Sequence, residues 1–175
     1  MAEIQKDTYA GLVMRWLTGA IYAPIKIVGA RQVKVMTRAM SLAFVDQLAR
    51  EGEQNGTKVS PTNNVVDALE QYRKLESASN LCEEKDVTIS PTDEGNTRIV
   101  FTDCPYGPLC NKTLAALLAR GDFNKATVPC LRMETYSACA TKLCKTRQPY
   151  TMIQFAPGAR CEGQLNASRV AKKED

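Results

Sequence analysis

The spacing of apolar residues changes once along this 175-residue chain, and the change limits the fold more than any other feature of the sequence. Before Cys82, apolar residues recur about every three to four positions, the period of an amphipathic helix, whereas after it they alternate with polar residues, the period of a β-strand. Helices followed by strands with short helices between them are typical of an α+β fold rather than an alternating α/β fold. We therefore expect N-terminal helices packed on a small antiparallel sheet.

The first 80 residues are expected to be helical, in one domain with a cysteine-rich α+β part at 81–175. A first helix is predicted at 9–21 and a second at 31–50. The apolar surface of the second is wide enough to predict contacts on more than one side. A third helix begins near residue 64, with Asn63 or Asn64 as its N-cap. The residues of this third helix that are expected to face the core are Val65, Val66, Leu69 and Tyr72.

The second half of the chain contains the expected sheet. Residues 87–90 and 97–102 are rich in β-forming residues and flank a turn-rich connection, which predicts a hairpin. A short helix at 112–119, another short helix opened by Pro129, and a strand at 150–155 complete the expected elements.

The chain has seven cysteines and no histidine. The missing histidine excludes Ser-His-Asp and Cys-His nucleophile systems, histidine-ligated catalytic zinc and proximal-histidine haem. Glu3 and Asp7 stand where a secretory signal would be basic, and no run of 18 apolar residues occurs, so we expect a cytoplasmic protein without a transmembrane segment. In a reducing compartment, thiols are more often metal ligands, catalytic groups or buried apolar groups than disulfides.

Six of the cysteines lie after the hairpin, where the chain is also basic. Residues 104–175 carry 11 Lys and Arg against 5 Asp and Glu. Neighbouring cations lower the pKa at which a thiolate forms, and they would offset the negative charge of an all-thiolate metal site. Sulfur ligands without histidine select zinc or an iron–sulfur cluster, and the sequence does not decide between these two. The predicted metal ligands are Cys104, Cys110, Cys130, Cys139, Cys144 and Cys161.

The spacing of these cysteines is irregular. The segment from Cys104 to Cys110 is rich in Pro and Gly, so its backbone can wrap around an ion. Cys139 and Cys144 are five positions apart, which in a continuous helix rotates the second sulfur by roughly 140° from the first. Joint ligation by these two would therefore require a helix end or a break. Cys82, which stands apart from the group, is expected to be a small buried apolar residue.

A resemblance to known proteins rests on the order of several short motifs. They are Val87-Thr88-Ile89, Ile99-Val100-Phe101, Asp103-Cys104-Pro105, Cys130 and the segment 156–162 that ends Arg160-Cys161-Glu162. Their order resembles the 4-vinyl reductase-type small-molecule-binding domains and the proteins similar to L-2-amino-thiazoline-4-carboxylic acid hydrolase, an anaerobe-rich group. The resemblance implies an α+β ligand-binding fold with helices against a twisted antiparallel sheet. It also implies a sensor or accessory role, in some members with a cysteine-bound metal.

Three classes of function stay open at this point. The first is a cysteine-ligated metal protein acting as a small-molecule-binding, redox-sensing or accessory module. The second is a hydrolase-like enzyme with the thiolate of Cys104 or Cys161 as nucleophile. Its proton carrier would be Asp103, Glu134 or Glu162. The third is a structural or subunit-interface protein with inert core cysteines.

The expected partners follow from the same features. A small hydrophobic molecule or a protein partner fits the resemblance, and the N-terminal helices predict a homo-oligomer. Nucleic acid is not an expected partner, because the net charge is only +4, aromatic residues make up 6% of the chain, and no binding motif occurs.

Overall fold

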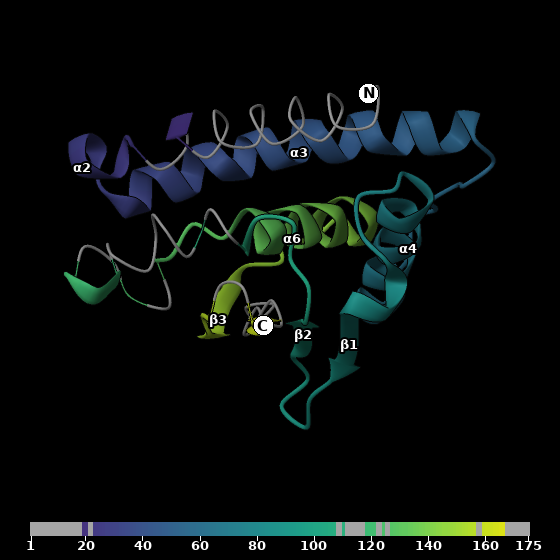
Figure 1. Cartoon of the computed structure of the whole chain (residues 1–175). Helices are drawn as coiled ribbons and strands as arrows, with labels where there is room; N and C mark the ends of the chain where they lie inside the picture. Colours follow the sequence, from purple (N-terminus) through teal and green to yellow (C-terminus); the bar gives the residue numbers. More distant parts are fainter. Residues whose placement is uncertain are drawn as a thin grey trace, which may run out of the picture.

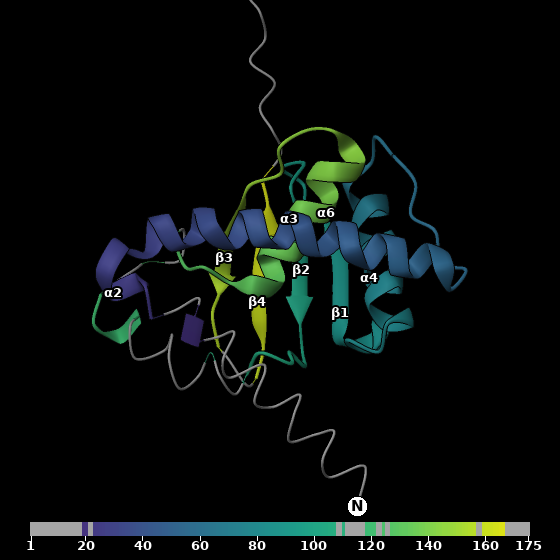
Figure 2. The same cartoon turned by 90° about the horizontal axis from the view of Figure 1, so that it is seen from above.

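The computed structural model describes residues 19–20, 23–107, 110, 118–121, 124, 127–156 and 159–166. Most of the expected helix at 9–21 and most of the expected helix at 112–119 lie outside these residues. The described elements form layers, in which α6 lies between the long helix α3 on one side and a four-stranded sheet on the other (Figures 1 and 2). This arrangement confirms the predicted α+β fold with N-terminal helices packed on a small antiparallel sheet.

The helices of the N-terminal half are α2 (Ile25–Val28), α3 (Ala30–Gln54) and α4 (Val65–Ala78). The Asn64 side chain caps α4 by accepting hydrogen bonds from the backbone N–H groups of Val66 at 2.9 Å and Asp67 at 3.3 Å, as an N-cap residue should. Leu69 and Tyr72 of α4 are fully buried, whereas Val65 and Val66 are half-buried. The first turn of α4 therefore lies at the margin of the core.

The sheet is antiparallel throughout and has the strand order β1-β2-β4-β3. A short 3-10 turn, η1 (Glu84–Asp86), leads into β1 (Val87–Pro91), and β1 pairs with β2 (Thr97–Phe101) in the predicted hairpin. β3 (Tyr150–Gln154) matches the predicted strand near residue 150, and β4 (Cys161–Leu165) lies between β2 and β3. β4 was not predicted, because its sequence contains a glycine and few β-forming residues.

Gly163 in β4 is explained by its neighbour in the next layer. A Cβ atom at this position would lie 2.8 Å from Cε and 2.9 Å from Sδ of Met133 in α6. The absence of a side chain lets α6 approach the sheet closely.

The helix α6 (Leu131–Cys144) is longer than the short helix expected after Pro129. Residues 132–140 are all buried, because α3, α4 and the sheet surround this helix. A helix with neighbours on every side shows no amphipathic pattern from which its length could be predicted. Its polar side chains are buried as well, including Arg132, Glu134 and Ser137.

The described part of the chain contains no helix with the length and apolar character needed to cross a bilayer.

Candidate ligand pocket and buried polar network

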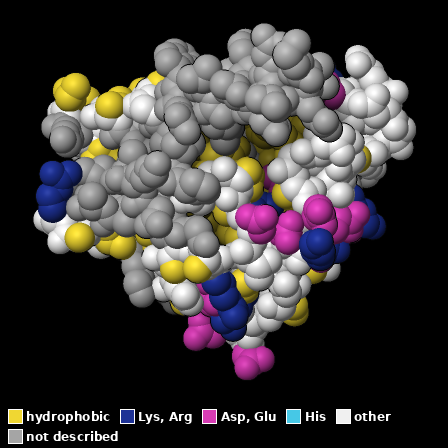
Figure 3. All heavy atoms as spheres, viewed as in Figure 1, with side chains coloured by type: hydrophobic (Ala, Val, Ile, Leu, Met, Phe, Trp, Pro, Cys, Tyr) yellow, Lys and Arg dark blue, Asp and Glu magenta, His cyan; other side chains and the backbone are white. Residues whose placement is uncertain are grey.

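A pocket of about 330 Å³ lies where the end of α4 meets η1 and the chain that leaves β2. This volume falls within the usual range for small-molecule sites, roughly 300–1,000 Å³. Its wall includes Cys82 and three carboxylates, Glu83, Asp86 and Asp103. Figure 3 shows acidic side chains gathered, with Lys or Arg among them, on the side of the molecule that carries α4 and β1. We call this hollow the Cys82 pocket.

The wall of the Cys82 pocket is hydrogen-bonded to a buried carboxylate. The Cys82 thiol donates to Oε2 of Glu76 at 3.3 Å, and the Tyr136 hydroxyl donates to the same oxygen at 2.7 Å. Burial, followed by the charge of Glu76, raises the pKa of Cys82 to about 12. Cys82 therefore presents a neutral thiol to the pocket at physiological pH.

Arg132 supplies the opposite charge. Its side chain is 1% exposed, and its Nη2 lies 3.7 Å from Oε2 of Glu76. Nη1 donates to the backbone carbonyl of Asp103 at 2.6 Å, and the guanidinium carbon lies 4.6 Å from the centre of the Phe101 ring. Burial is the largest single influence and disfavours the charge of Arg132, but the Glu76 carboxylate and several smaller electrostatic influences together outweigh it, so the pKa of Arg132 is raised. Nη2 has no hydrogen-bond partner within the described residues.

Aromatic rings enclose this ion pair. Tyr136 stacks edge-to-face on Tyr72 at 4.8 Å and on Phe101 at 5.3 Å between ring centres. Burial and the charge of Glu76 raise the pKa of Tyr136, which keeps its hydroxyl a donor. These ring contacts pack beside the Glu76–Arg132 pair, whose side chains are 8% and 1% exposed.

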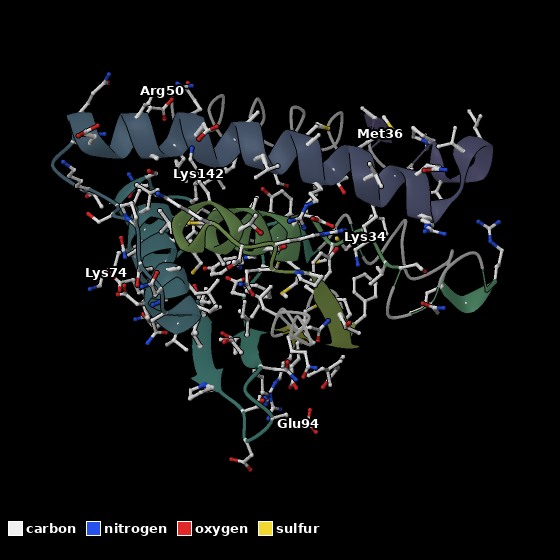
Figure 4. The ribbon with its side chains drawn as sticks, turned by 180° about the vertical axis from the view of Figure 1, so that it is seen from behind. Lys34, Met36, Arg50, Lys74, Glu94 and Lys142 are labelled. Carbon is white, nitrogen blue, oxygen red and sulfur yellow. The ribbon has the colours of Figure 1, made fainter. Side chains whose placement is uncertain are left out.

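A second buried polar cluster lies on the α3 side of α6. Glu134 is 1% exposed, and burial raises the pKa of its carboxyl while the Lys34 ammonium opposes that shift. Lys34 Nζ lies 3.8 Å from the centre of the Tyr150 ring and 3.4 Å from the Tyr150 carbonyl oxygen. Figure 4 shows Lys34 on the side of α3 that faces α6 and β3. This cluster joins α3, α6 and β3, and no described cavity opens onto it.

A hollow of about 490 Å³ lies beside the hairpin turn, whose tip carries Glu94 (Figure 4). Its buried group is Glu162 on β4, which accepts from Arg98 at 2.7 Å and lies 3.5 Å from Arg160. Because this carboxylate is already paired with two arginines, the hairpin hollow offers a ligand no unsatisfied buried group. Glu162, a candidate proton carrier, is thus an ion-pair partner in this structure.

The structure separates the six predicted metal ligands into two groups. After burial, the charges of Cys104, Cys110 and Cys161 raise the pKa of Cys130, so these four thiols share one region at the start of α6. Cys139 and Cys144 lie farther along the continuous helix α6, and the Cys139 sulfur is 4.0 Å from the carbonyl oxygen of Ala68. Among the described residues, no group of three or more Cys, Asp or Glu is arranged to hold a metal ion. Metal ligation by the six stays a prediction.

The thiols are protonated rather than activated. Burial is the largest cause of a raised pKa at Cys104, Cys130 and Cys161, and likewise at Cys139 and Cys144. A nucleophilic cysteine needs the opposite shift, toward a lower pKa. The thiols proposed as nucleophiles, Cys104 and Cys161, therefore lack the environment that this role requires.

Sequence reasoning missed the Glu76–Arg132 pair. The available signal was the position of Glu76, which lies four residues after Tyr72 on the inward face of α4. A carboxylate on the buried face of a helix needs a buried partner. Cys82, expected in the apolar core, is instead half-buried in the pocket wall.

No protein-family model matches the chain, and a search of curated proteins found no significant match. Among solved structures, the fold is similar to the crystal structure of the phenol-responsive sensory domain of the transcription activator PoxR with phenol. The TM-score is 0.54 with 11% sequence identity, over 87% of this chain and 73% of that chain. At this identity the similarity shows a shared fold.

Proposed function

We propose that the chain is a small-molecule-binding module and that its ligand occupies the Cys82 pocket. The observation that carries this proposal is the hydrogen bond from Cys82, in the pocket wall, to the buried Glu76. A ligand in the pocket would therefore contact Cys82, whose hydrogen-bond partner Glu76 forms the ion pair with Arg132 that joins α4 to α6. The shared fold with a phenol-responsive sensory domain supports the same function.

The chemistry of the pocket favours a ligand that donates a hydrogen bond. Glu76 Oε2 accepts from Cys82 and Tyr136, and the thiol is the weaker of these donors. A ligand hydroxyl that takes the place of the thiol would give Glu76 a stronger, charge-assisted hydrogen bond. Glu76 on α4 is also hydrogen-bonded to Tyr136 and paired with Arg132, both on α6. A change of its hydrogen-bond partner would therefore alter the contact between α4 and α6.

Calorimetric titration with phenol and a panel of small hydroxyl-bearing aromatic molecules tests this function. We expect saturable binding by at least one compound, weakened at least tenfold by Ser77→Phe, which fills the pocket from its wall without altering the ion pair. The control Glu94→Gln, at the hairpin tip, should bind like the wild type. Failure of the whole panel, or unchanged binding by Ser77→Phe, would contradict the proposal.

A second candidate function is metal binding by the thiols of the α6 start, as zinc or an iron–sulfur cluster. It is favoured by one observation, the shared electrostatic neighbourhood of Cys104, Cys110, Cys130 and Cys161. Soft sulfur donors suit either metal group, and a bound metal cation deprotonates thiols that burial alone keeps neutral.

Metal analysis by mass spectrometry of anaerobically prepared protein tests this second function. We expect stoichiometric zinc or iron that is lost in Cys130→Ser and retained in the matched control Cys139→Ser. Metal-free wild-type protein would rule the site out.

A further inference from the structure

Arg132 lies behind the wall of the Cys82 pocket. Its Nη1 donates at 2.6 Å to the backbone carbonyl of Asp103, a residue that lines the pocket. Burial and the charge of Glu76 raise the pKa of Cys82, and the Arg132 guanidinium opposes that rise, so it lies close to the thiol as well. The guanidinium thus contacts two residues of the wall, although the side chain of Arg132 is only 1% exposed.

One nitrogen of Arg132 has no acceptor. Nη2 lies 3.7 Å from Oε2 of Glu76, too far for a hydrogen bond, and it has no hydrogen-bond partner in the described part of the chain. A buried donor without an acceptor is costly. The same Oε2 accepts from Cys82 at 3.3 Å, and a thiol is a weak hydrogen-bonding group both as donor and as acceptor. The position of the thiol is therefore next to a strong acceptor and a strong donor.

A group that satisfies both neighbours must donate one hydrogen bond and accept another. The Glu76 carboxylate only accepts, and the Arg132 guanidinium only donates. A hydroxyl does both with a single oxygen atom. An ether oxygen only accepts, an ammonium only donates, and an ionised carboxylate has no proton to give to Glu76. The pair of Glu76 and Arg132 therefore distinguishes a hydroxyl from each of these groups.

The charge of the wall narrows the class of ligand further. Glu83, Asp86 and Asp103 line the pocket, and no Lys or Arg is among its described lining residues. Lys85, which does not line the pocket, pairs with Glu83 at 2.6 Å. Three carboxylates against this one ammonium leave the wall negative, so it repels an anionic ligand.

We propose that the Cys82 pocket recognises one hydroxyl group of its ligand in both hydrogen-bonding roles, with Glu76 as the acceptor and Nη2 of Arg132 as the donor. Arg132 is then a specificity-determining residue, and the ligands are small hydroxyl-bearing molecules without a negative charge. This inference rests on the proposed function, because it assumes that the ligand occupies the Cys82 pocket.

Calorimetric titration of the wild-type chain with matched compounds tests this recognition. Phenol both donates and accepts, anisole only accepts, and aniline donates but accepts poorly. We expect anisole and aniline each to bind about tenfold or more weakly than phenol, since each leaves one buried polar group without its partner. The control 3-methylphenol has as many heavy atoms as anisole and should bind like phenol.

The outcomes separate this inference from the proposed function. Aniline or anisole that binds as tightly as phenol would overturn the inference, because one of the two protein groups would then not be used, and would leave a ligand pocket in place. Absence of binding by phenol and 3-methylphenol alike would contradict the proposed function itself.

Two variants of Cys82 test the same point from the protein side. The hydroxyl of Cys82→Ser offers Glu76 and Arg132 the donor and the acceptor that we assign to the ligand, so this variant should bind phenol several-fold more weakly than the wild type. Cys82→Ala removes the competing thiol and should bind phenol more tightly. Thermal melts verify that both variants are folded, and equal phenol affinities of the two would overturn the inference.

A charged ligand tests the selection against anions. 4-Hydroxybenzoate should bind several-fold more weakly than 4-hydroxybenzamide, which has nearly the same shape and no charge. Asp86→Asn, which removes one charge of the wall, should narrow this difference, and so should added salt. Equal affinities of the two compounds for the wild type would overturn the selection against negative charge.

Discussion

Replacing Arg132 by Met removes one charge of the buried ion pair while keeping much of the side-chain volume. Arg132 and Glu76 have side-chain exposures of 1% and 8%, so solvent screens neither charge. Removing one partner of such a pair leaves an uncompensated buried charge and costs about 3–5 kcal/mol. For a domain of this size, that loss lowers the melting temperature by about 6–20 °C. Glu76→Gln, which leaves the Arg132 charge without its partner, should cost a similar amount.

The double variant Arg132→Met with Glu76→Gln removes both charges, so its loss should be smaller than the sum of the single losses by about 1–3 kcal/mol. Urea unfolding followed by circular dichroism measures all four members of the cycle. Lys58→Met breaks the exposed Lys58–Glu53 pair and serves as control, with an expected change within about 0.5 kcal/mol. Single losses below about 1 kcal/mol, or additive ones, would refute a tightly coupled buried pair.

Three further predictions follow from buried groups. Burial raises the pKa of Cys139 to about 12, so this thiol ionises in the unfolded state at a lower pH than in the folded state. The stability of the wild type should therefore fall from about pH 9 upward, and at pH 10 it should have lost about 1–2 kcal/mol more than Cys139→Ala. Equal losses for the two proteins in urea unfolding at alkaline pH would contradict this. Burial also raises the pKa of Glu134, which penalises its charged form, so Glu134→Gln should raise the urea midpoint at pH 7 and lose that advantage below about pH 4. A midpoint gain that persists at low pH would point to packing instead of charge. Gly163→Ala should lower stability by about 1–3 kcal/mol, because its Cβ would lie 2.8 Å from Cε of Met133. Adding Met133→Val, which has a shorter side chain, should recover part of this loss. A melting temperature unchanged by Gly163→Ala would show that Met133 moves aside.

The elements that the sequence predicted well have one face in the core and one in solvent. α3, α4 and the hairpin are of this kind, so their apolar residues recur with a visible period. α6 is buried on every side and β4 contains Gly163, so neither shows such a period. The wide apolar surface of α3 predicted contacts on more than one side of the helix; one side packs on α6, whereas Val35, Met36 and Met40 on the other side are exposed.

The candidate site was harder to predict because it depends on contacts between distant residues. Glu76 and Arg132 are 56 positions apart, and only the packing of α4 on α6 brings them together. The sequence suggested that six cysteines lie together, but Cys139 and Cys144 lie farther along α6, away from Cys130 at its start. The basic residues near the thiols did not predict activated cysteines, because burial outweighs the neighbouring positive charge at Cys104 and Cys161.

The location of bound ligand tests the central claim most directly. Backbone amide signals in a nuclear magnetic resonance titration with the tightest binder of the aromatic panel report that location residue by residue. Our account predicts shifts at residues 76–83 and 103–105 around the Cys82 pocket, together with shifts near Arg132 and Tyr136 in α6. Shifts confined to the hairpin hollow around residues 92–98, with α4 and α6 unchanged, would contradict it.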